Sequence, residues 1–333
     1  MPIRCFAARV ARVFALLCPA SGLVLVLAGA VNASAAVTVT DVGGKVRVEI
    51  GGVLFTEYHY QGVSRPYLYP VVGPGGALMT RHWPMDEVAG EEHDHPHHRS
   101  LWWAHGDING TDFWSESPKA GKTVHKSFSE LKSGDDAGSI QSRNELVALD
   151  GKVVADEDLA IKIYAGKDER ILDFDVVVHA TRGALTFGDT KEGTMAIRLA
   201  ETMRLVRGGK PGEGHIVTSE GVRDGDTWGK RADWVDYYGP VNGQIVGVAI
   251  FDQPKNPKHP TWWHVRDYGL FAANPFGVHE FEKKPADTGN VIVPMGKSIE
   301  FRYRFFFHRG DEKQAHVAER YAEYVRGGAP KAP

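Results

Sequence analysis

The sequence has little cysteine: Cys5 and Cys18 are the only two among 333 residues, and both lie near the N-terminus. A cysteine-based zinc site, a cysteine nucleophile and a disulfide framework are therefore not expected in the rest of the chain. An excess of positive charge is also missing, because 39 Lys and Arg stand against 42 Asp and Glu. Since no long basic run occurs either, nucleic acid is not expected as a partner.

Residues 13–31 carry no charge and are rich in Leu, Val and Ala; they follow three arginines and precede the small residues Ala33-Ser34-Ala35. This order is typical of a signal peptide with its cleavage site. We therefore predict a signal peptide over residues 1–35 and a single domain over 36–333, periplasmic or extracellular and without stable membrane insertion after cleavage. The alternative is a retained anchor, because about 19 uncharged residues nearly suffice to span a bilayer.

Short stretches in which apolar and polar residues alternate dominate the remaining chain. The clearest are residues 37–40, 45–50, 53–60, 139–149, 159–164, 171–179, 195–199, 244–251, 291–293 and 298–308. A period of two predicts strands, and turn residues such as Val241-Asn242-Gly243 separate them. In 298–308, Phe301 and every second residue up to Phe307 are aromatic, which predicts one strongly apolar face.

One helix is predicted near the C-terminus, between Asp311 as its cap and the pair Gly327-Gly328. Its apolar residues recur at three- and four-residue spacing: Ala315, Ala318, Tyr321, Ala322 and Val325. Many strands followed by one helix predict a mainly β protein, a large antiparallel β-sandwich of two packed sheets.

Histidine and tryptophan are concentrated in residues 81–114, which hold six of the 15 histidines and four of the eight tryptophans. If the segment is extended, His93, His95 and His97 share one side, where imidazoles can bind a divalent metal such as Zn or Cu. Exposed indoles could instead stack on sugar rings. The alternatives left open are a metal site, a polar pocket without metal, and a structural loop, because Pro96 interrupts the pattern.

A second group of aromatic and charged residues occurs in 256–276. In an extended segment Trp262, His264, Arg266 and Tyr268 share a face, and Arg is seldom buried without a partner. We favour a pocket that binds an anionic or polyhydroxyl ligand. The alternative is an edge strand on which Arg266 pairs with Asp267 or another carboxylate.

Between the two regions, Glu192 lies in a glycine-bounded turn before a strand, a common place for a catalytic base.

Four motifs resemble a bacterial family labelled PmoA, a name associated with methane oxygenase. They are DHPHHRSLWWAHGDINGTDFW (94–114), GDTKEGTMAIRLAE (188–201), WGKRADWVDYYG (228–239) and HPTWWHVRDYGLFAANPFG (259–277). The resemblance extends over most of the chain after residue 35. Its label implies a histidine-bound copper or zinc ion.

The segment RPYLYPVVGPG (65–75), followed by His97-His98-Arg99, is similar to the aldose-epimerase-like family. That resemblance implies a galactose-mutarotase-like supersandwich that binds sugar, with a histidine as general acid and a glutamate as base. His98 or His105, together with His264, would fill the acid role. Glu192 or Glu201 would fill the base role.

We thus expect an exported protein that acts on a small-molecule carbohydrate, as an epimerase, lyase or hydrolase using histidine and glutamate. The alternatives are a carbohydrate-binding protein without activity and a copper or zinc metalloprotein. The candidate catalytic residues are His98, His105, Glu192 and His264. The candidate ligand-binding residues are Arg99, Trp103, Asn109, Arg198, Trp262, Arg266, Tyr268 and Asn274. The candidate metal ligands are His93, His95 and His97.

Overall fold

The computed structural model describes residues 36–328 and residue 330, so the predicted signal peptide lies outside the described residues. The start of the domain at residue 36 stays a prediction. Within the described ranges, none of the helices combines the length and the apolar character needed to cross a membrane.

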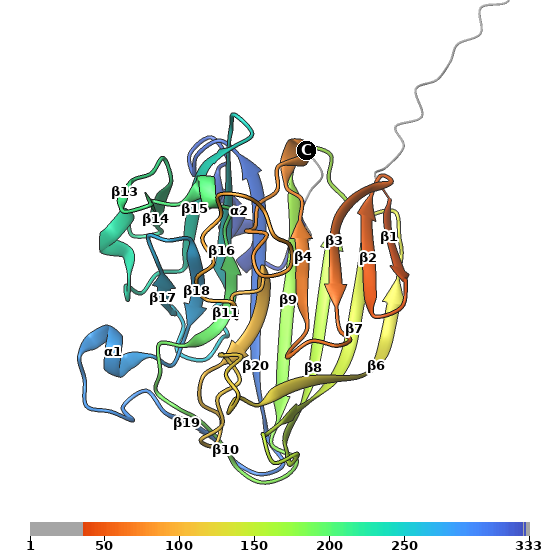
Figure 1. The fold of residues 1–333 in the computed structure, drawn as a ribbon, viewed down its shortest axis with the longest axis vertical. Coiled ribbons are helices and arrows are strands. Elements are labelled where there is room, and N and C mark those ends of the chain that lie inside the picture. The colour runs from red at the N-terminus through yellow and green to blue at the C-terminus, as the bar shows by residue number, and fades with distance from the viewer. Residues whose placement is uncertain (1–35, 329, 331–333) are drawn as a thin grey trace, which may run out of the picture. The chain divides into compact units, whose positions relative to one another are not determined.

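Two antiparallel sheets of eight strands each make up most of the structure (Figure 1). The first sheet contains, in spatial order, β1 (Val37–Asp41), β2 (Lys45–Ile50), β3 (Val53–His59), β4 (Tyr67–Val71), β5 (Leu101–His105), β11 (Gly193–Arg198), β18 (Leu270–Asn274) and β17 (Trp262–Val265). The second contains β14 (His215–Thr218), β15 (Trp234–Val241), β16 (Gln244–Asp252), β20 (Ser298–Arg309), β9 (Arg170–His179), β8 (Val153–Tyr164), β7 (Ala137–Val147) and β6 (Lys122–Lys132). The predicted mainly β, antiparallel sandwich is confirmed.

Smaller elements connect the sheets. Two further pairs of strands are β10 (Leu185–Phe187) with β19 (Val291–Val293), and β12 (Val206–Arg207) with β13 (Lys210–Pro211). The helical elements are the 3-10 turns η1 (Pro74–Gly76), η2 (Glu201–Met203) and η3 (Asp224–Thr227), and the α-helices α1 (Val278–Glu282) and α2 (Val317–Val325). The short helix α1 has no repeating apolar pattern, and the sequence analysis missed it.

The predicted aromatic face of β20 forms the centre of the main core. Phe301, Tyr303, Phe305 and Phe307 are all fully buried, in one cluster with residues of both sheets such as Val48. Full burial of such a side chain contributes roughly 1.5–3 kcal/mol. The sandwich is therefore held together mainly by apolar residues of alternating position between the sheets.

The predicted turn between β15 and β16 is confirmed. Asn242 and Gly243 both have positive φ angles, 52° and 75°. Such a pair is typical of a two-residue hairpin turn whose twist matches that of the flanking strands, and it explains the Asn-Gly sequence.

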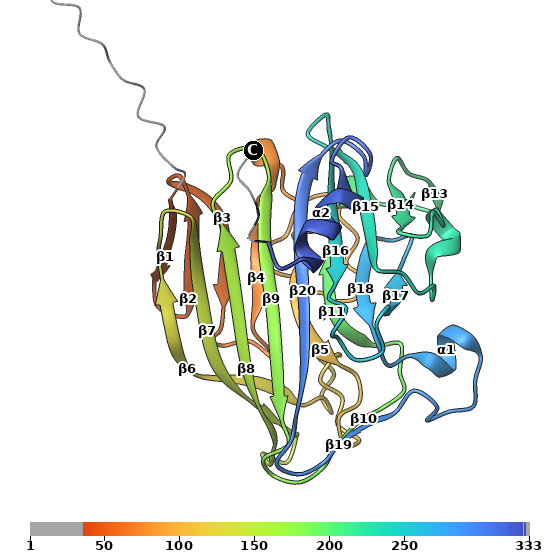
Figure 2. The same cartoon turned by 180° about the vertical axis from the view of Figure 1, so that it is seen from behind.

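The C-terminal helix begins later than predicted. Asp311 does not cap α2, because its Oδ1 accepts the N–H groups of Lys313 and Gln314 in the turn before the helix. The helix starts at Val317 and lies on the outer face of the second sheet (Figure 2), where Tyr321 packs edge-on against Phe251. The apolar spacing identified the helix, but a local turn uses the expected cap.

The first sheet has apolar side chains on both faces. On β5, Leu101 and Trp103 belong to the core between the sheets, whereas Trp102 and Ala104 belong to a separate cluster. Because successive residues of a strand point to opposite faces, this second cluster lies on the outer face. We call it the outer cluster: Tyr67, Tyr69, Trp102, Ala104, Trp114, Ala196, Leu270 and Ala272.

Candidate functional site

A cavity of about 600 Å³ lies beside the outer cluster, and histidines dominate its polar lining. Its lining residues are His95, His97, His98, Gly106, Asp112, Trp114, Ser115, Lys191, Glu192, His264, Arg266 and Tyr268. We call it the histidine cavity. The structure thus brings together seven predicted site residues from the loop before β5, the turn before β11, and β17 with the turn after it.

Two buried arginines hold the histidine loop in place. Arg81 donates to the Asp94 carboxylate and to the backbone carbonyl oxygens of Asp94 and His95, at 3.0 and 3.2 Å. Arg198, on the outer face of β11, donates from Nη2 to both oxygens of the Asp94 carboxylate, at 2.9 and 3.0 Å. Both arginine side chains are fully buried. The loop conformation therefore depends on charged hydrogen bonds that reach it from the sheet.

Asp94 is kept ionised by its surroundings. Burial by itself raises the pKa of Asp94, but the hydrogen bond from His95 and the guanidinium groups of Arg198 and Arg81 outweigh it and hold that pKa well below its ordinary value. An ionised carboxylate can only accept hydrogen bonds. The His95 Nδ1, which lies 2.8 Å from Asp94 Oδ2, must therefore carry the proton.

The assignment of that proton gives His95 a defined chemical role. With Nδ1–H donating to Asp94, a neutral His95 ring has its lone pair on Nε2, where it can accept a proton. The ring is also fixed by stacking between His98 and Tyr268, with centroids 4.7 and 5.2 Å away. His95 was predicted as a metal ligand, and this hydrogen bond fits an oriented base as well as a metal ligand.

His98 has the opposite tautomer. The Nη1 of Arg198 lies 3.0 Å from His98 Nδ1, and because a guanidinium only donates, this nitrogen must accept. Burial and the charge of Arg198 lower the pKa of His98 well below its ordinary value, so the ring is neutral. Its single proton is therefore on Nε2, and His98 is a hydrogen-bond donor towards a ligand.

His264 is fixed in the same form by a different donor. The indole Nε1 of Trp228 donates to His264 Nδ1 at 3.3 Å, which leaves the ring proton on Nε2. Burial and the positive charge of Arg266 lower the pKa of His264 to about 3. His98 and His264 are thus two neutral N–H donors in one cavity, and neither is charged near neutral pH.

Glu192 supplies the cavity with a carboxylate. It lies in the turn before β11, as predicted, and its Oε1 is 3.1 Å from Lys191 Nζ. The amide of Asn274, a predicted ligand-binding residue, donates to the backbone oxygen of Thr190 at 3.0 Å. Asn274 therefore positions this turn from the neighbouring strand instead of lining the cavity.

The remaining predicted residues of β5 face the opposite way. Trp103 belongs to the core between the sheets, and the His105 ring is buried there against Phe276, with its Nε2 2.9 Å from the backbone oxygen of Gly188. Burial lowers the pKa of His105 to about 4. The reason is strand periodicity: residues 102 and 104 face outward, so 103 and 105 cannot.

Three other predicted binding residues have structural partners away from the cavity. Arg99 forms two hydrogen bonds with Glu116, at 2.7 and 2.8 Å. Asn109 has a φ of 53° in a turn and joins residues 184 and 186 through its amide. The indole of Trp262 donates to Glu282 at 3.0 Å. The structure does not bring these residues to the histidine cavity.

The expectation of exposed indoles in residues 81–114 was wrong. Trp102, Trp103 and Trp114 are at most 4% exposed. Trp83 is stacked on His93 at 4.1 Å. Ligand recognition in the histidine cavity must therefore rely more on hydrogen bonds than on stacking against tryptophan.

The three histidines predicted as metal ligands do not lie side by side. Residues 93–97 do not form a strand, and His95 has a φ of 41°, so the alternating face expected for an extended segment is absent. His93 stacks on Trp83 outside the cavity, while His95 and His97 line it. Pro96 and the arginine-bound loop account for this difference.

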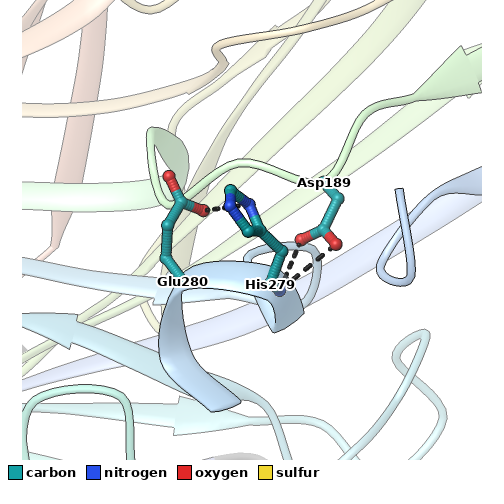
Figure 3. A group of neighbouring side chains, drawn as sticks. All are labelled: Asp189, His279 and Glu280. Carbon is teal, nitrogen blue, oxygen red and sulfur yellow. Dashed lines mark hydrogen bonds and ion pairs between the residues drawn. The ribbon is translucent and has the colours of Figure 1, made fainter. Parts of the chain in front are cut away.

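Another set of side chains has ligand atoms within 4.8 Å of one another: Asp189, His279 and Glu280 (Figure 3). The Asp189 carboxylate accepts the backbone N–H groups of His279, at 3.0 Å, and Gly289, at 2.7 Å. Glu280 faces His279 Nδ1 at 3.6 Å and Lys191 at 3.7 Å. These contacts join α1 to the turn of Lys191, so the set already has a structural role without a cation.

Sequence reasoning missed the residues that orient the histidines. Arg81, Asp94 and Trp228 set the loop conformation and two of the tautomers, and Asp112, Trp114, Ser115 and Lys191 complete the lining. The Asp94-His95 pair was the one local signal, since an acid beside a histidine can fix its tautomer. The contacts of Arg81 and Trp228 join distant parts of the sequence and leave no local pattern.

Residues 45–322 match a family described as a family of unknown function (DUF6807). The chain belongs to this family. A search of curated proteins gave no match.

Several solved structures have a weak likeness to the chain. A glycoside hydrolase family 97 enzyme from Pseudoalteromonas sp. strain K8, in complex with panose, shares 9% identity and a TM-score of 0.34 over 82% of this chain and 34% of its own. A galactose mutarotase related enzyme from Lactobacillus acidophilus shares 10% identity and a TM-score of 0.29, over 82% of this chain and 97% of its own. A 4-alpha-glucanotransferase from Thermococcus litoralis shares 13% identity and a TM-score of 0.28, over 81% of this chain and 39% of its own.

The chain spans about a third of the length of the glycoside hydrolase that it resembles. With TM-scores of 0.28–0.34, these likenesses are too weak to transfer an activity. The fold class rests on the strand topology itself.

Proposed function

We propose that this DUF6807 protein acts on a carbohydrate bound in the histidine cavity, by moving a proton between the sugar and the protein. The observation that carries the proposal is the opposite hydrogen bonding of the rings: Nδ1 accepts in His98 and His264, which leaves their protons on Nε2, whereas Nδ1 donates to Asp94 in His95. A cavity of about 600 Å³ is within the usual range for small-ligand sites, roughly 300–1,000 Å³.

The roles differ from those implied by the mutarotase resemblance. A general acid must carry a proton that it can release, and a neutral imidazole releases its remaining N–H proton only at very high pH. With a pKa of about 3 for His264, that ring stays neutral and stabilises negative charge on a sugar oxygen by donating a hydrogen bond. Glu192 or His95 then accepts the one proton that the sugar loses.

The test is a panel of sugars and glycosides offered to the purified protein. We expect one sugar class to raise the melting temperature and to be converted, with conversion followed by NMR of the sugar protons. His98→Asn and His264→Asn should weaken conversion more than binding, because a donor to developing charge acts mainly in the transition state. No stabilisation and no conversion by any sugar at millimolar concentration would contradict the proposal.

A carbohydrate-binding protein without activity is the alternative reading of the same cavity. In that case Glu192→Gln binds sugar normally and no member of the panel is converted. The tryptophans first expected to carry such binding, Trp103 and Trp262, do not line the cavity. The variant that now tests the binding role is Tyr268→Ala.

We also propose that the protein is exported, on the basis of the signal-peptide pattern of residues 1–35. N-terminal sequencing of the protein recovered from the periplasm or the medium tests this. The resemblance to the PmoA family and its copper or zinc ion likewise stay predictions, and elemental analysis of untagged protein tests the metal.

A further inference from the structure

Arg266 differs from the other arginines that surround the histidine cavity. Arg81 and Arg198 are bound to Asp94, and Arg99 is bound to Glu116. Among the described residues, the guanidinium of Arg266 forms no hydrogen bond and no ion pair, although its side chain lines the cavity and is only partly exposed. The ion pair with Asp267 that sequence analysis left open is not formed.

The described arginines include two others whose side chains form no polar contact, Arg207 and Arg326, and both are exposed to solvent. Solvation explains why those two need no partner. Arg266 gives up part of its hydration without gaining a carboxylate, a cost that a binding site can recover when its ligand arrives. Arg266 is therefore the arginine from which we infer binding of an anion from a ligand.

Aromatic rings hold the guanidinium without using its N–H groups. Its carbon lies 5.4 Å from the ring centroid of Tyr268 and 6.0 Å from that of Trp228, which is the range of cation–π contacts. Such contacts use the face of the guanidinium or its charge and leave the in-plane donors available. Those donors form the fork that matches the two oxygens of a carboxylate.

The other charges of the cavity do not neutralise Arg266. Lys191 lies between Glu192 and Glu280, at 3.1 and 3.7 Å. Asp112 accepts the backbone N–H groups of Trp114 and Ser115 through one oxygen and the Ser115 hydroxyl through the other. The neutral donors His98 and His264 add no charge. Of the two cationic side chains in this lining, Lys191 and Arg266, only the guanidinium of Arg266 has no carboxylate partner.

We propose that the sugar bound in the histidine cavity carries an anionic group, a carboxylate as in a uronic acid, and that Arg266 binds it through its guanidinium fork. This inference rests on the proposed function, because it specifies the class of sugar that the same cavity accepts. It also assigns the nearby neutral N–H donors to the hydroxyl or carboxylate oxygens that the fork leaves unpaired.

The experiment is calorimetric titration of the full chain with D-glucuronate, D-galacturonate, the corresponding neutral sugars and glucose 6-sulfate. We expect at least one uronate to bind roughly ten times more tightly than its neutral counterpart, as a charge-assisted pair with two hydrogen bonds provides. Preference for the sulfate ester over both uronates would overturn the carboxylate, because the recognised group would then be tetrahedral.

Variants separate this inference from the proposed function. Arg266→Gln should remove the preference for the uronate over the neutral sugar, whereas Arg207→Gln, the exposed control, should keep that preference. Arg266→Lys keeps the charge without the fork, so it should retain only part of the preference. Melting temperatures near that of the unaltered chain show that the variants are folded.

The outcomes are distinct. If neutral sugars and uronates bind equally to the unaltered chain, the inference is wrong and the proposed function stands. If Arg266→Gln keeps the full preference for the uronate, the inference is again wrong. If no sugar of either kind binds, the proposed function fails, and the inference fails with it.

Discussion

Two cavities of nearly equal volume, about 600 and about 590 Å³, lie on different sheets and differ in how their side chains are held. The second one, which we call the sheet cavity, is formed by strands β6–β9 and the β6–β7 turn. It is lined by Glu130, Lys132, Gly134, Asp135, Asp136, Ala137, Gly138, Ser139, Gln141, Ala160, Ile161, Lys162, Asp173 and Asp175. Volume alone therefore does not distinguish a site.

Several polar side chains of the sheet cavity have partners in the same sheet. Glu130 accepts from Ser139 and Gln141, and Asp173 pairs with Arg304 at 2.6 Å. In the histidine cavity the side chains come from segments far apart in sequence, and buried arginines fix their direction. A functional site is therefore identified by side chains that are oriented towards the cavity, and not by the volume of the cavity.

The largest expected difference between the cavities concerns turnover. Glu192→Gln should lower the rate of sugar conversion about 10²–10⁴-fold with little change in binding, as is typical when a general base is removed. Glu130→Gln is the matched change in the sheet cavity and should leave the rate unchanged. Equal effects of the two variants would remove the reason for preferring the histidine cavity.

Arg198→Met should cause the largest loss of stability. It leaves Asp94 with fewer partners and releases the His98 Nδ1, so we expect the free energy of unfolding to fall by about 3 kcal/mol. Lys162→Met in the sheet cavity should change it by less than about 0.5 kcal/mol. Denaturant unfolding measures both. A loss of similar size in the two variants would mean that the arginine is no anchor.

Acid should destabilise the histidine cavity and act in the opposite direction on the sheet cavity. Burial lowers the pKa of His264 from 6.5 to about 3, so below pH 6.5 the unfolded chain binds protons that the folded chain does not. The unfolding free energy then falls by about 1.4 kcal/mol per pH unit for such a histidine. Burial raises the pKa of Asp175 to about 7, so its protonation below that pH favours the folded state.

Unfolding curves between about pH 6 and about pH 4.5 test these signs. His264→Gln should make the decline in stability on acidification shallower, and Asp175→Asn should make it steeper. The same shift from both variants would show that the two cavities do not differ in this respect.

The smallest expected effect is that of metal. Because His93 lies apart from His95 and His97, we expect less than about 0.1 Zn or Cu per untagged chain after incubation and dialysis, measured by elemental analysis. A stoichiometric ion lost in His93→Ala would restore the predicted histidine site. An ion lost in His279→Ala, and retained in His93→Ala, would instead assign the metal to Asp189, His279 and Glu280.

Sequence periodicity predicted the fold well and the candidate site in part. The strands with strict alternation, such as the aromatic strand that became β20, were found because one face is buried. Strands β4, β5 and β18 were missed as strands because both faces of the first sheet are covered there and their burial is continuous.

The same continuous burial explains the errors in the site. On β5, four apolar or aromatic residues stand in a row before His105, so the pattern does not tell which of Trp102 and Trp103 faces the cavity. In β17 and the turn after it, the two-residue spacing correctly placed His264, Arg266 and Tyr268 together, although Trp262 of the same pattern does not line the cavity. The tautomers depend on Arg198, Asp94 and Trp228, whose contacts with the histidines span 100, 1 and 36 residues of sequence.

The aromatic rings beside the cavity form a continuous column. Trp102, His98, His95 and Tyr268 follow one another with centroids 5.5, 4.7 and 5.2 Å apart, from the outer face of the first sheet to the cavity wall. A ligand that moves His95 or Tyr268 therefore changes the surroundings of an indole that it never contacts. We therefore expect the fluorescence of Trp102 to change when a ligand occupies the cavity.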